Sequence, residues 1–322
     1  MAVLWILIGL AVLVLASDQA IRGARDLARS AGISPLVVGL TITAVGTSLP
    51  EIATNLAVAV ETLRGDVDAS GLAVGNIVGS NLSQITLLLG ITALVATLKL
   101  PGGSIRRDGG MVLAALVLMG LAAANGVVGR LEGLGLVAVY LVYVSWMLVR
   151  ARKEGHEARV AALAEDEVEA PAEPKRWHIV RMVLGLAFVL GSAQVVVNQG
   201  VVLAESIGVS EILIGHGVGL ATGLPELVLA VSAVRAGAQE MGIGNLLGSN
   251  ITDPLLSFGL GAVVHPVVVD PATLAFDGVY WLVCTVIALL LLWEQRDLTR
   301  PEGASLVLLY ALFVWLRIVV VG

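Results

Sequence analysis

Two glutamates, Glu51 and Glu226, each follow a proline inside a stretch that is otherwise apolar enough to cross a bilayer. Glu51 ends Gly46-Thr47-Ser48-Leu49-Pro50-Glu51, and Glu226 ends Ala221-Thr222-Gly223-Leu224-Pro225-Glu226. Because a charge is costly at membrane depth, an intramembrane carboxylate is a functional-site hypothesis by default. Two of them at the same place in a duplicated stretch predict one site to which both copies contribute.

A second pair of matching motifs follows the two glutamates. The motifs are Gly75-Asn76-Ile77-Val78-Gly79-Ser80-Asn81-Leu82-Ser83-Gln84 and Gly244-Asn245-Leu246-Leu247-Gly248-Ser249-Asn250-Ile251-Thr252-Asp253. Their glycines are four residues apart and share a helix face, the pattern that lets membrane helices pack closely. Ser80 and Ser249 follow the second glycine. Gln84 and Asp253 lie four residues further along the same face, so one copy offers an amide where the other offers an acid.

The residue types around each glutamate favour binding of a hard cation. A proline removes a backbone donor and disturbs the carbonyl four residues earlier, here at Gly46 and Ala221. Freed carbonyls persist at membrane depth only where they face a cavity or bind something. Carbonyl, hydroxyl and carboxylate oxygens together suit Ca²⁺, Mg²⁺ or Na⁺ rather than zinc or copper.

Three buried carboxylates are therefore expected, at Glu51, Glu226 and Asp253. Two ionised acids balance one Ca²⁺. Without Ca²⁺, their repulsion must be relieved by monovalent cations or by protons. Competition for one carboxylate cluster is thus a sufficient physical basis for exchange.

The composition is that of an integral membrane protein. The 322 residues are 57% hydrophobic and 14% charged, with a mean hydropathy of +0.94, whereas soluble domains are about 45–50% apolar and about 25% charged. The net charge of −6 argues against a nucleic-acid partner, which favours a basic face. The single cysteine, Cys284, cannot form a disulfide within the chain.

Ten stretches are long and apolar enough to span, since a spanning helix needs roughly 20 apolar residues. They cover about 2–21, 34–60, 70–98, 109–128, 131–150, 177–204, 211–234, 241–265, 272–293 and 303–321. The sequence therefore predicts an all-α membrane protein with a five-helix repeat in 1–150, a polar solvated linker in 151–176 and a second repeat in 177–322. Because five is odd, the second repeat enters the membrane from the opposite side and is inverted.

The basic residues predict an orientation. With the N-terminus outside, 16 of the 19 Lys and Arg residues fall on the cytoplasmic side, which leaves Arg64, Arg130 and Arg317 outside. This bias obeys the positive-inside rule. We expect a multi-pass protein of the cell (inner) membrane with both termini outside. Its expected partners are the lipid bilayer and transported cations, with no obligate protein partner evident.

At these motifs the chain resembles the cation/Ca²⁺ exchanger superfamily, and most closely its prokaryotic sodium/calcium exchanger branch. The resemblance covers the ten-span layout and both repeats. It implies a secondary antiporter that exchanges Ca²⁺ for Na⁺ by alternating access and needs no resident cofactor. It also implies roles for individual residues.

Glu51 and Glu226 would be the central Ca²⁺ carboxylates, completed by the backbone carbonyls of Thr47 and Thr222. The Na⁺ positions would be lined by Thr47, Ser48, Ser80, Thr222 and Ser249, with carbonyls near Ala44 and Gly219. Asp253 would be a protonatable partner in the middle of the site, facing Gln84.

Three departures from the family pattern keep an H⁺-coupled Ca²⁺ or other divalent cation exchanger as an alternative. Gly223 stands where Ser48 stands in the first copy, so one hydroxyl ligand is missing. Gln84 replaces the Asn or Asp that such exchangers commonly carry. The second copy is one residue shorter, with eleven positions from Gly215 to Glu226 and twelve from Gly39 to Glu51.

Two other classes of function compete with an exchanger. An intramembrane serine protease would use Ser48 as nucleophile and His216 as base, but the second copy lacks the serine and keeps Pro-Glu. The sequence therefore argues against an enzyme. A channel is a further alternative, although channels usually assemble identical subunits, and an inverted repeat within one chain suits alternating access.

Overall fold

The computed structural model describes residues 1–65, 70–99, 105–164, 175–207, 222–294 and 297–321, and these residues are almost entirely helical. The chain forms two compact units, each built from both halves of the sequence. The first unit holds Met1–Thr47 and Tyr143–Asn245, and the second holds Ser48–Val142 and Leu246–Gly322. The expectation of a mostly helical membrane protein is confirmed, whereas the number of spans is a separate question.

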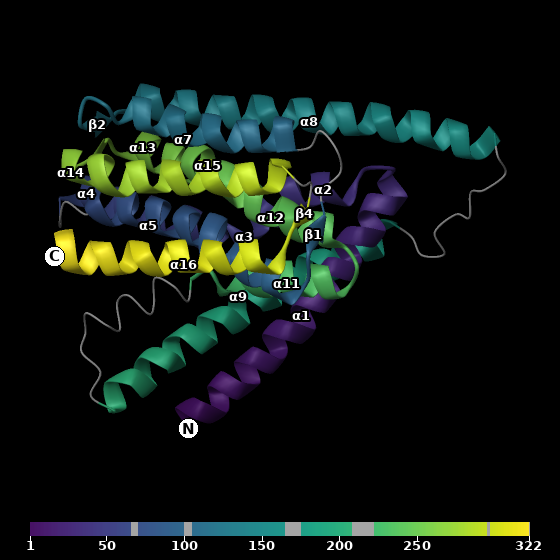
Figure 1. The fold of residues 1–322 in the computed structure, drawn as a ribbon, viewed down its shortest axis with the longest axis horizontal. Coiled ribbons are helices and arrows are strands. Elements are labelled where there is room, and N and C mark those ends of the chain that lie inside the picture. The colour runs from purple at the N-terminus through teal and green to yellow at the C-terminus, as the bar shows by residue number, and fades with distance from the viewer. Residues whose placement is uncertain (66–69, 100–104, 165–174, 208–221, 295–296, 322) are drawn as a thin grey trace. The chain divides into compact units, whose positions relative to one another are not determined.

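The first unit is dominated by α1 (Ala2–Ala31) and α9 (Lys175–Ser206), which pack along each other (Figure 1). Small residues permit this close contact. A Cβ added to Gly23 would lie 2.6 Å from the Met182 nitrogen, and one added to Gly185 would lie 2.6 Å from the Ala20 nitrogen. The core between these helices also includes Leu229 of α11 (Leu224–Arg235).

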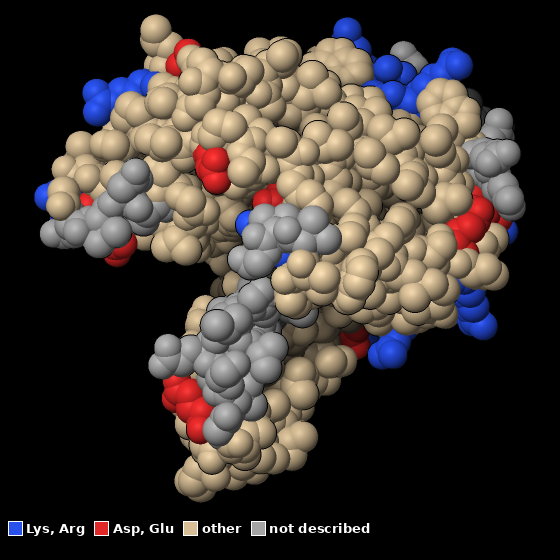
Figure 2. Space-filling view, turned by 60° about the vertical axis from the view of Figure 1, so that its left-hand side comes forward, with Lys and Arg blue, Asp and Glu red and all other residues tan. Residues whose placement is uncertain are grey.

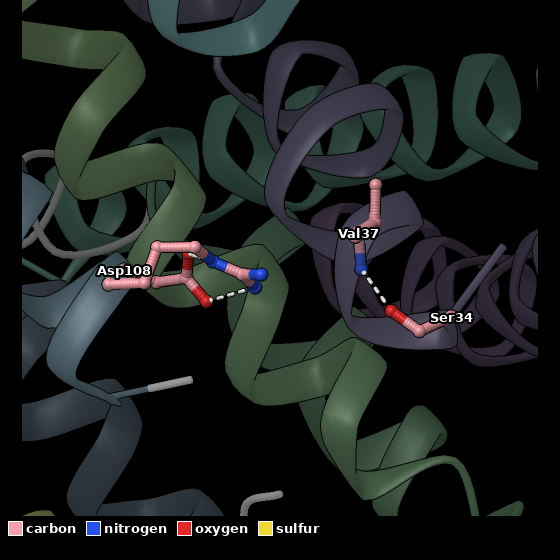
Figure 3. A network of polar contacts seen from close by, with 4 residues as sticks. Ser34, Val37 and Asp108 are labelled. Atoms are coloured by element: carbon pink, nitrogen blue, oxygen red, sulfur yellow. Dashed lines mark hydrogen bonds and ion pairs between the residues drawn. The ribbon is translucent and has the colours of Figure 1, made fainter. Parts of the chain in front are cut away.

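The segment that leads to the first glutamate motif is a broken helix. It consists of α2 (Pro35–Val38), the π-helical turn η1 (Gly39–Thr43) and α3 (Ala44–Thr47). Ser34 caps its start by accepting a hydrogen bond from the Val37 backbone at 3.3 Å (Figure 3). A π turn closes i→i+5 bonds, so this segment presents its carbonyls differently from a regular helix.

Two motif glycines hold this broken helix against α12 (Gln239–Thr252). A Cβ added to Gly39 would lie 2.5 Å from the Met241 carbonyl oxygen, and one added to Gly244 would lie 2.7 Å from the Leu36 carbonyl oxygen. The close packing expected of the glycine motif is thus present at Gly244. At Gly75 and Gly79 an added Cβ would meet no atom of the described residues within 4 Å.

The second unit contains the remaining helices. They are α4 (Leu49–Arg64), α5 (Ser70–Ser83), η2 (Gln84–Leu88), α6 (Leu89–Val95), η3 (Ile105–Gly109), α7 (Gly110–Ala122), the first part of α8 (Arg130–Ala164), η4 (Asp253–Ser257), α13 (Phe258–Val264), α14 (Pro271–Thr273), η5 (Leu274–Gly278), α15 (Val279–Glu294), α16 (Arg300–Leu316) and η6 (Arg317–Val321). α4 packs against η4 and α13, and α16 packs against α6. Figure 1 shows α5, α15 and α16 running along one another.

Local irregularities recur at matching places in the two halves. The π turns that begin at Gln84 and Asp253 are 169 positions apart. The π turns at Ile105 and Leu274 have the same separation, and each contains a buried aspartate, Asp108 or Asp277. Asp108 pairs with Arg107 at 2.6 Å (Figure 3), and Asp277 pairs with Arg317 at 3.2 Å.

Two of the four short strands also recur at matching places in the two halves. β1 (Leu98–Lys99) and β3 (Val267–Val268) each begin three residues after the helix that precedes them, α6 or α13. β1 pairs antiparallel with β4 (Asp297–Leu298), and β2 (Val127–Val128) pairs antiparallel with β3. Each pair therefore joins one strand from the first half of the sequence to one strand from the second.

By length and composition, six helices of the described chain could cross a membrane, or seven if Pro35–Thr47 and Leu49–Arg64 form one broken span. The surface fits this environment, because large apolar side chains such as Leu7, Leu15 and Leu131 are exposed and charged residues are sparse on the face in Figure 2. The count of ten spans stays a prediction.

The structure adds a detail to the polar linker expected in 151–176, which stays a prediction. α8 continues past residue 151 to Ala164, and α9 begins at Lys175. The reason is composition, since residues 151–164 are rich in Ala, Glu and Arg and contain no proline. These residues have high helix propensity, so the helix extends past the apolar part.

We predict that Gly244→Ala destabilises the protein, because the new methyl group would press on the Leu36 carbonyl oxygen. Overpacking of this kind typically costs about 1–3 kcal/mol. The melting temperature of the purified protein in detergent should fall. Gly191→Ala should leave it unchanged or raise it slightly, because no atom of the described residues lies within 4 Å of a Cβ there and alanine favours a helix. Equal melting temperatures for the two variants would contradict the close packing at Gly244.

Candidate cation site

Both glutamates occupy the first turn of a helix that starts at a matched break. Ser48 precedes α4 with φ −77° and ψ 3°, and Gly223 precedes α11 with φ −79° and ψ 4°. The backbone then resumes identically, since Ile52 donates to the Ser48 carbonyl at 3.0 Å and Leu227 donates to the Gly223 carbonyl at 3.1 Å. The two copies therefore share the same local geometry.

The place of the two glutamates in the first turn of a helix lowers the cost of burying their charge. Glu51 is 1% exposed and Glu226 is fully buried. The first turn of a helix carries unsatisfied N–H groups and the positive end of the helix dipole, which together stabilise a nearby negative charge. Pro50 and Pro225 sit in the same turns, where a residue without an N–H group fits. The break thus makes a buried carboxylate less costly.

Asp253 lies at the centre of an amide network in the second unit. Asn81 Nδ2 and Gln84 Nε2 donate to its Oδ2 at 3.3 and 3.2 Å. Asn250 Nδ2 in turn donates to Gln84 Oε1 at 3.0 Å. The structure therefore brings Gln84 and Asp253 together. All four side chains are at least 99% buried.

The same carboxylate keeps capacity for a further ligand. Ser48 and Ser80 lie beside it. Its second oxygen, Oδ1, is buried without a hydrogen bond among the described residues. Ser249 is also fully buried, and its hydroxyl has no hydrogen-bond partner in the described structure. Buried polar atoms without partners are rare in proteins, so these oxygens are candidate ligands for a cation or a proton.

Thr47 and Ala44 form a second polar group, in the first unit. The Thr47 hydroxyl lies 3.2 Å from the carbonyl oxygens of Thr43 and Ala44 and 3.3 Å from Asn245 Oδ1. A hydroxyl has one proton, so it satisfies one of these acceptors at a time. The other acceptors keep lone pairs that a cation can use.

The predicted site residues are divided between the two units. The second unit holds Glu51, Ser48, Ser80, Gln84, Ser249 and Asp253, and the first holds Glu226, Ala44, Thr47 and the partly buried Thr222. Gly219 and His216 lie outside the described residues. Within the described chain no three His, Cys, Asp or Glu side chains form a metal-binding group.

Sequence reasoning did not assign a role to the buried amides. Asn81, Asn245 and Asn250 belong to the repeated motifs, but only the structure shows which carboxylate, hydroxyl or amide each one contacts. Asn55 also went unnoticed, one turn after Glu51, and its Nδ2 donates to Ser257 Oγ at 2.7 Å. The available signal was a polar residue four positions after Glu51, and another, Ser257, four positions after Asp253.

The fold is that of a known class of membrane exchangers. A solved structure of the sodium-calcium exchanger NCX_Mj matches with a TM-score of 0.80 over 98% of this chain and 97% of that one, at 23% identity. Together with the apolar helices, the match defines a multi-pass membrane protein with this exchanger fold.

Sequence comparison gives the family. The profile of the sodium/calcium exchanger protein family matches residues 1–149 and 177–319, so the chain belongs to that family. The putative antiporter CaxA of Alkalimonas amylolytica is 32% identical over 96% of each chain. The inner membrane protein YrbG of Escherichia coli is 30% identical over 97% of this chain and 94% of its own. The sodium/calcium exchanger MaX1 of Methanosarcina acetivorans is 29% identical over 96% of each.

We predict that Gly223→Ser folds like the wild type and strengthens Na⁺ binding. The backbone angles at Gly223 nearly equal those at Ser48, so a serine adopts them without strain, and its hydroxyl would supply the oxygen that the second copy lacks. A bound ion raises stability as its concentration exceeds its dissociation constant. We compare the melting temperature in Na⁺-free buffer with that in about 100 mM Na⁺, a concentration chosen to saturate the site. The rise in melting temperature should therefore be larger in Gly223→Ser than in the wild type.

Gly223→Ala is the matched control, because it adds the Cβ without the hydroxyl. An equal Na⁺-dependent rise in all three proteins would show that the missing hydroxyl has no part in Na⁺ binding.

Proposed function

We propose that this protein is a secondary antiporter that exchanges Ca²⁺ for Na⁺ at a buried carboxylate site by alternating access. The observation that carries the proposal is the matched helix break at Ser48 and Gly223, which puts Glu51 and Glu226 in equivalent buried first turns. Family membership supports it, and so do relatives named as an antiporter and as a sodium/calcium exchanger. The chain is then a transporter and not an enzyme, with cations as cargo and no resident cofactor.

In the Ca²⁺-loaded state, Glu51 and Glu226 are proposed to supply the two negative charges, and the Thr47 and Thr222 carbonyls to complete the shell. Ca²⁺ takes six to eight oxygen ligands in flexible geometry, so neutral oxygens must accompany the carboxylates. The empty site, with its uncompensated negative charge, is the costly state. This cost links release of one cation to binding of the next.

In the Na⁺-loaded state, the Ser48, Ser80 and Ser249 hydroxyls and the Ala44 and Gly219 carbonyls are proposed ligands, with Asp253 at the centre. The alternative is an H⁺-coupled exchanger of Ca²⁺ or another divalent cation. Two observations favour it: Asp253 Oδ1 is buried with no hydrogen bond among the described residues, and Gly223 stands where the first copy has the Ser48 hydroxyl. A proton needs no oxygen shell, whereas Na⁺ does.

The architecture proposed for this cycle is ten spanning helices in two inverted repeats, with both termini on the outer side of the inner membrane. The recurring π turns and the exchange of strands between β1–β4 and β2–β3 support an internal two-fold relationship. Inverted repeats give a transporter two related conformations that open to opposite sides. The unequal distribution of Lys and Arg supports the orientation.

We predict that Glu51→Gln and Glu226→Gln each abolish Ca²⁺ flux in proteoliposomes, because each removes one of the charges that neutralise Ca²⁺. The matched control is Glu61→Gln, an exposed residue on the same helix as Glu51, and its flux should stay within about twofold of wild type, as expected for an exposed charge. Near-normal flux in either core variant would remove that glutamate from the site.

The coupling ion can be identified from the gradient that drives Ca²⁺ uptake. Proteoliposomes loaded with Na⁺ and diluted into Na⁺-free buffer should accumulate Ca²⁺ if Na⁺ is the counter-ion. Uptake that follows an imposed pH gradient and ignores Na⁺ would establish the H⁺-coupled alternative. Downhill Ca²⁺ flux without any counter-ion would indicate a channel and contradict exchange.

A further inference from the structure

One polar pair lies a helical turn beyond the acidic residues, within the second unit. Asn55 follows Glu51 by four residues on α4, and Ser257 follows Asp253 by four residues on η4. Asn55 Nδ2 donates to Ser257 Oγ at 2.7 Å, and both side chains are at least 99% buried. The Asn55–Ser257 pair therefore extends the polar surface of the acid-bearing helices toward the Arg64 end of α4 and the Val264 end of α13.

The Asn55 side-chain oxygen takes no part in the bond to Ser257. Asn55 Oδ1 is buried and has no hydrogen-bond partner among the described residues. A buried amide oxygen without a hydrogen bond destabilises a folded protein, so a role in helix packing alone does not account for it. The contact between α4 and α13 also depends on a glycine, because a Cβ added to Gly261 of α13 would lie 3.2 Å from the Asn55 carbonyl oxygen. The polar side chain is therefore not required for close packing.

The pair joins one residue from each half of the sequence, and the positions related to it by the repeat carry no equivalent pair. The residue four positions after Glu226 is Ala230, and the residue four positions after Gln84 is Leu88. The matching positions thus carry two apolar side chains that can neither hydrate nor bind a cation. If the repeats are inverted, a polar pair one turn from the acids is present on one side of the site and absent on the other.

We propose that Asn55 and Ser257 form a transfer site for the transported cation, one turn from the carboxylates, on one side of the site only. The proposal rests on the antiport function given above. The Asn55 amide oxygen and the Ser257 hydroxyl oxygen are neutral ligands that replace part of the water shell of Ca²⁺ or Na⁺ as the ion passes. Neutral oxygens hold the ion weakly, so it can move on to the carboxylates or leave.

The proposal predicts an asymmetric defect. Asn55→Ala and Ser257→Ala should each raise the half-saturating Ca²⁺ concentration about three- to tenfold at one membrane face, the loss expected for one neutral ligand. The other face should change by less than about twofold, because its entry path does not contain the pair. On the proposed orientation, the affected face is the external one.

Right-side-out and inside-out membrane vesicles allow the two faces to be measured separately. The matched control is Thr92→Val, which removes a buried hydroxyl that bonds the Leu88 carbonyl at 2.7 Å on α6, two turns beyond Gln84. This control should leave both half-saturating concentrations unchanged. Ser257→Ala is the mildest change and still tests the site if Asn55→Ala folds poorly.

A charge at the same place gives a second test. Asn55→Asp should lower the half-saturating Ca²⁺ concentration at the affected face and also slow turnover, because a carboxylate turns a weak transfer site into a trap. A purely structural Asn55 predicts the opposite, loss of folded protein from an uncompensated buried charge.

The outcomes separate this proposal from the antiport function on which it depends. Suppose that the wild type exchanges normally, and that Asn55→Ala and Ser257→Ala affect both faces equally or affect neither. That result would overturn the transfer site and leave the antiport function standing. Absence of exchange in the wild type itself would contradict both.

Discussion

The constraint on which this structure depends is the cost of a carboxylate at membrane depth. Glu51, Glu226 and Asp253 are almost completely buried in a membrane protein, and taking a charge out of water into such surroundings is costly. The fold lowers this cost without removing it. Two glutamates sit at helix starts, and the aspartate accepts hydrogen bonds from two amides. A residual negative charge is what makes such a site attract a cation.

The helix breaks follow from this constraint. A continuous helix would have no free N–H groups near Glu51, and it would use every carbonyl internally. Proline one residue before each glutamate ends the preceding segment, and the π turn η1 shifts the carbonyls just before it. Gly39 and Gly244 then let the backbones of the broken helix and α12 touch, which fixes the irregular segment against a regular helix. Packing thus stabilises a backbone that is irregular on its own.

Much of the site could be predicted from the sequence, because its key residues lie at helical spacing within repeated motifs. Spacing within one helix is enough to predict which side chains share a face. This holds for the Thr, Pro and Glu of the glutamate motifs and for Ser four residues before Gln or Asp. Contacts between distant segments could not be predicted in this way. The Asn55–Ser257 bond joins residues 202 positions apart, and the partners of Asn250 and Asn81 depend on which helices cross. The π turns and the extension of α8 to Ala164 also escaped, since both depend on backbone packing or propensity rather than on apolar periodicity.

The most direct test of the account is Ca²⁺ binding to the purified protein, measured by titration calorimetry in detergent. The account predicts one Ca²⁺ per chain, displaced by Na⁺ or by protons, because the ions compete for the same carboxylates. Ca²⁺ binding that neither Na⁺ nor low pH weakens, or no Ca²⁺ binding at all, would contradict the claim that the buried acids form an exchange site.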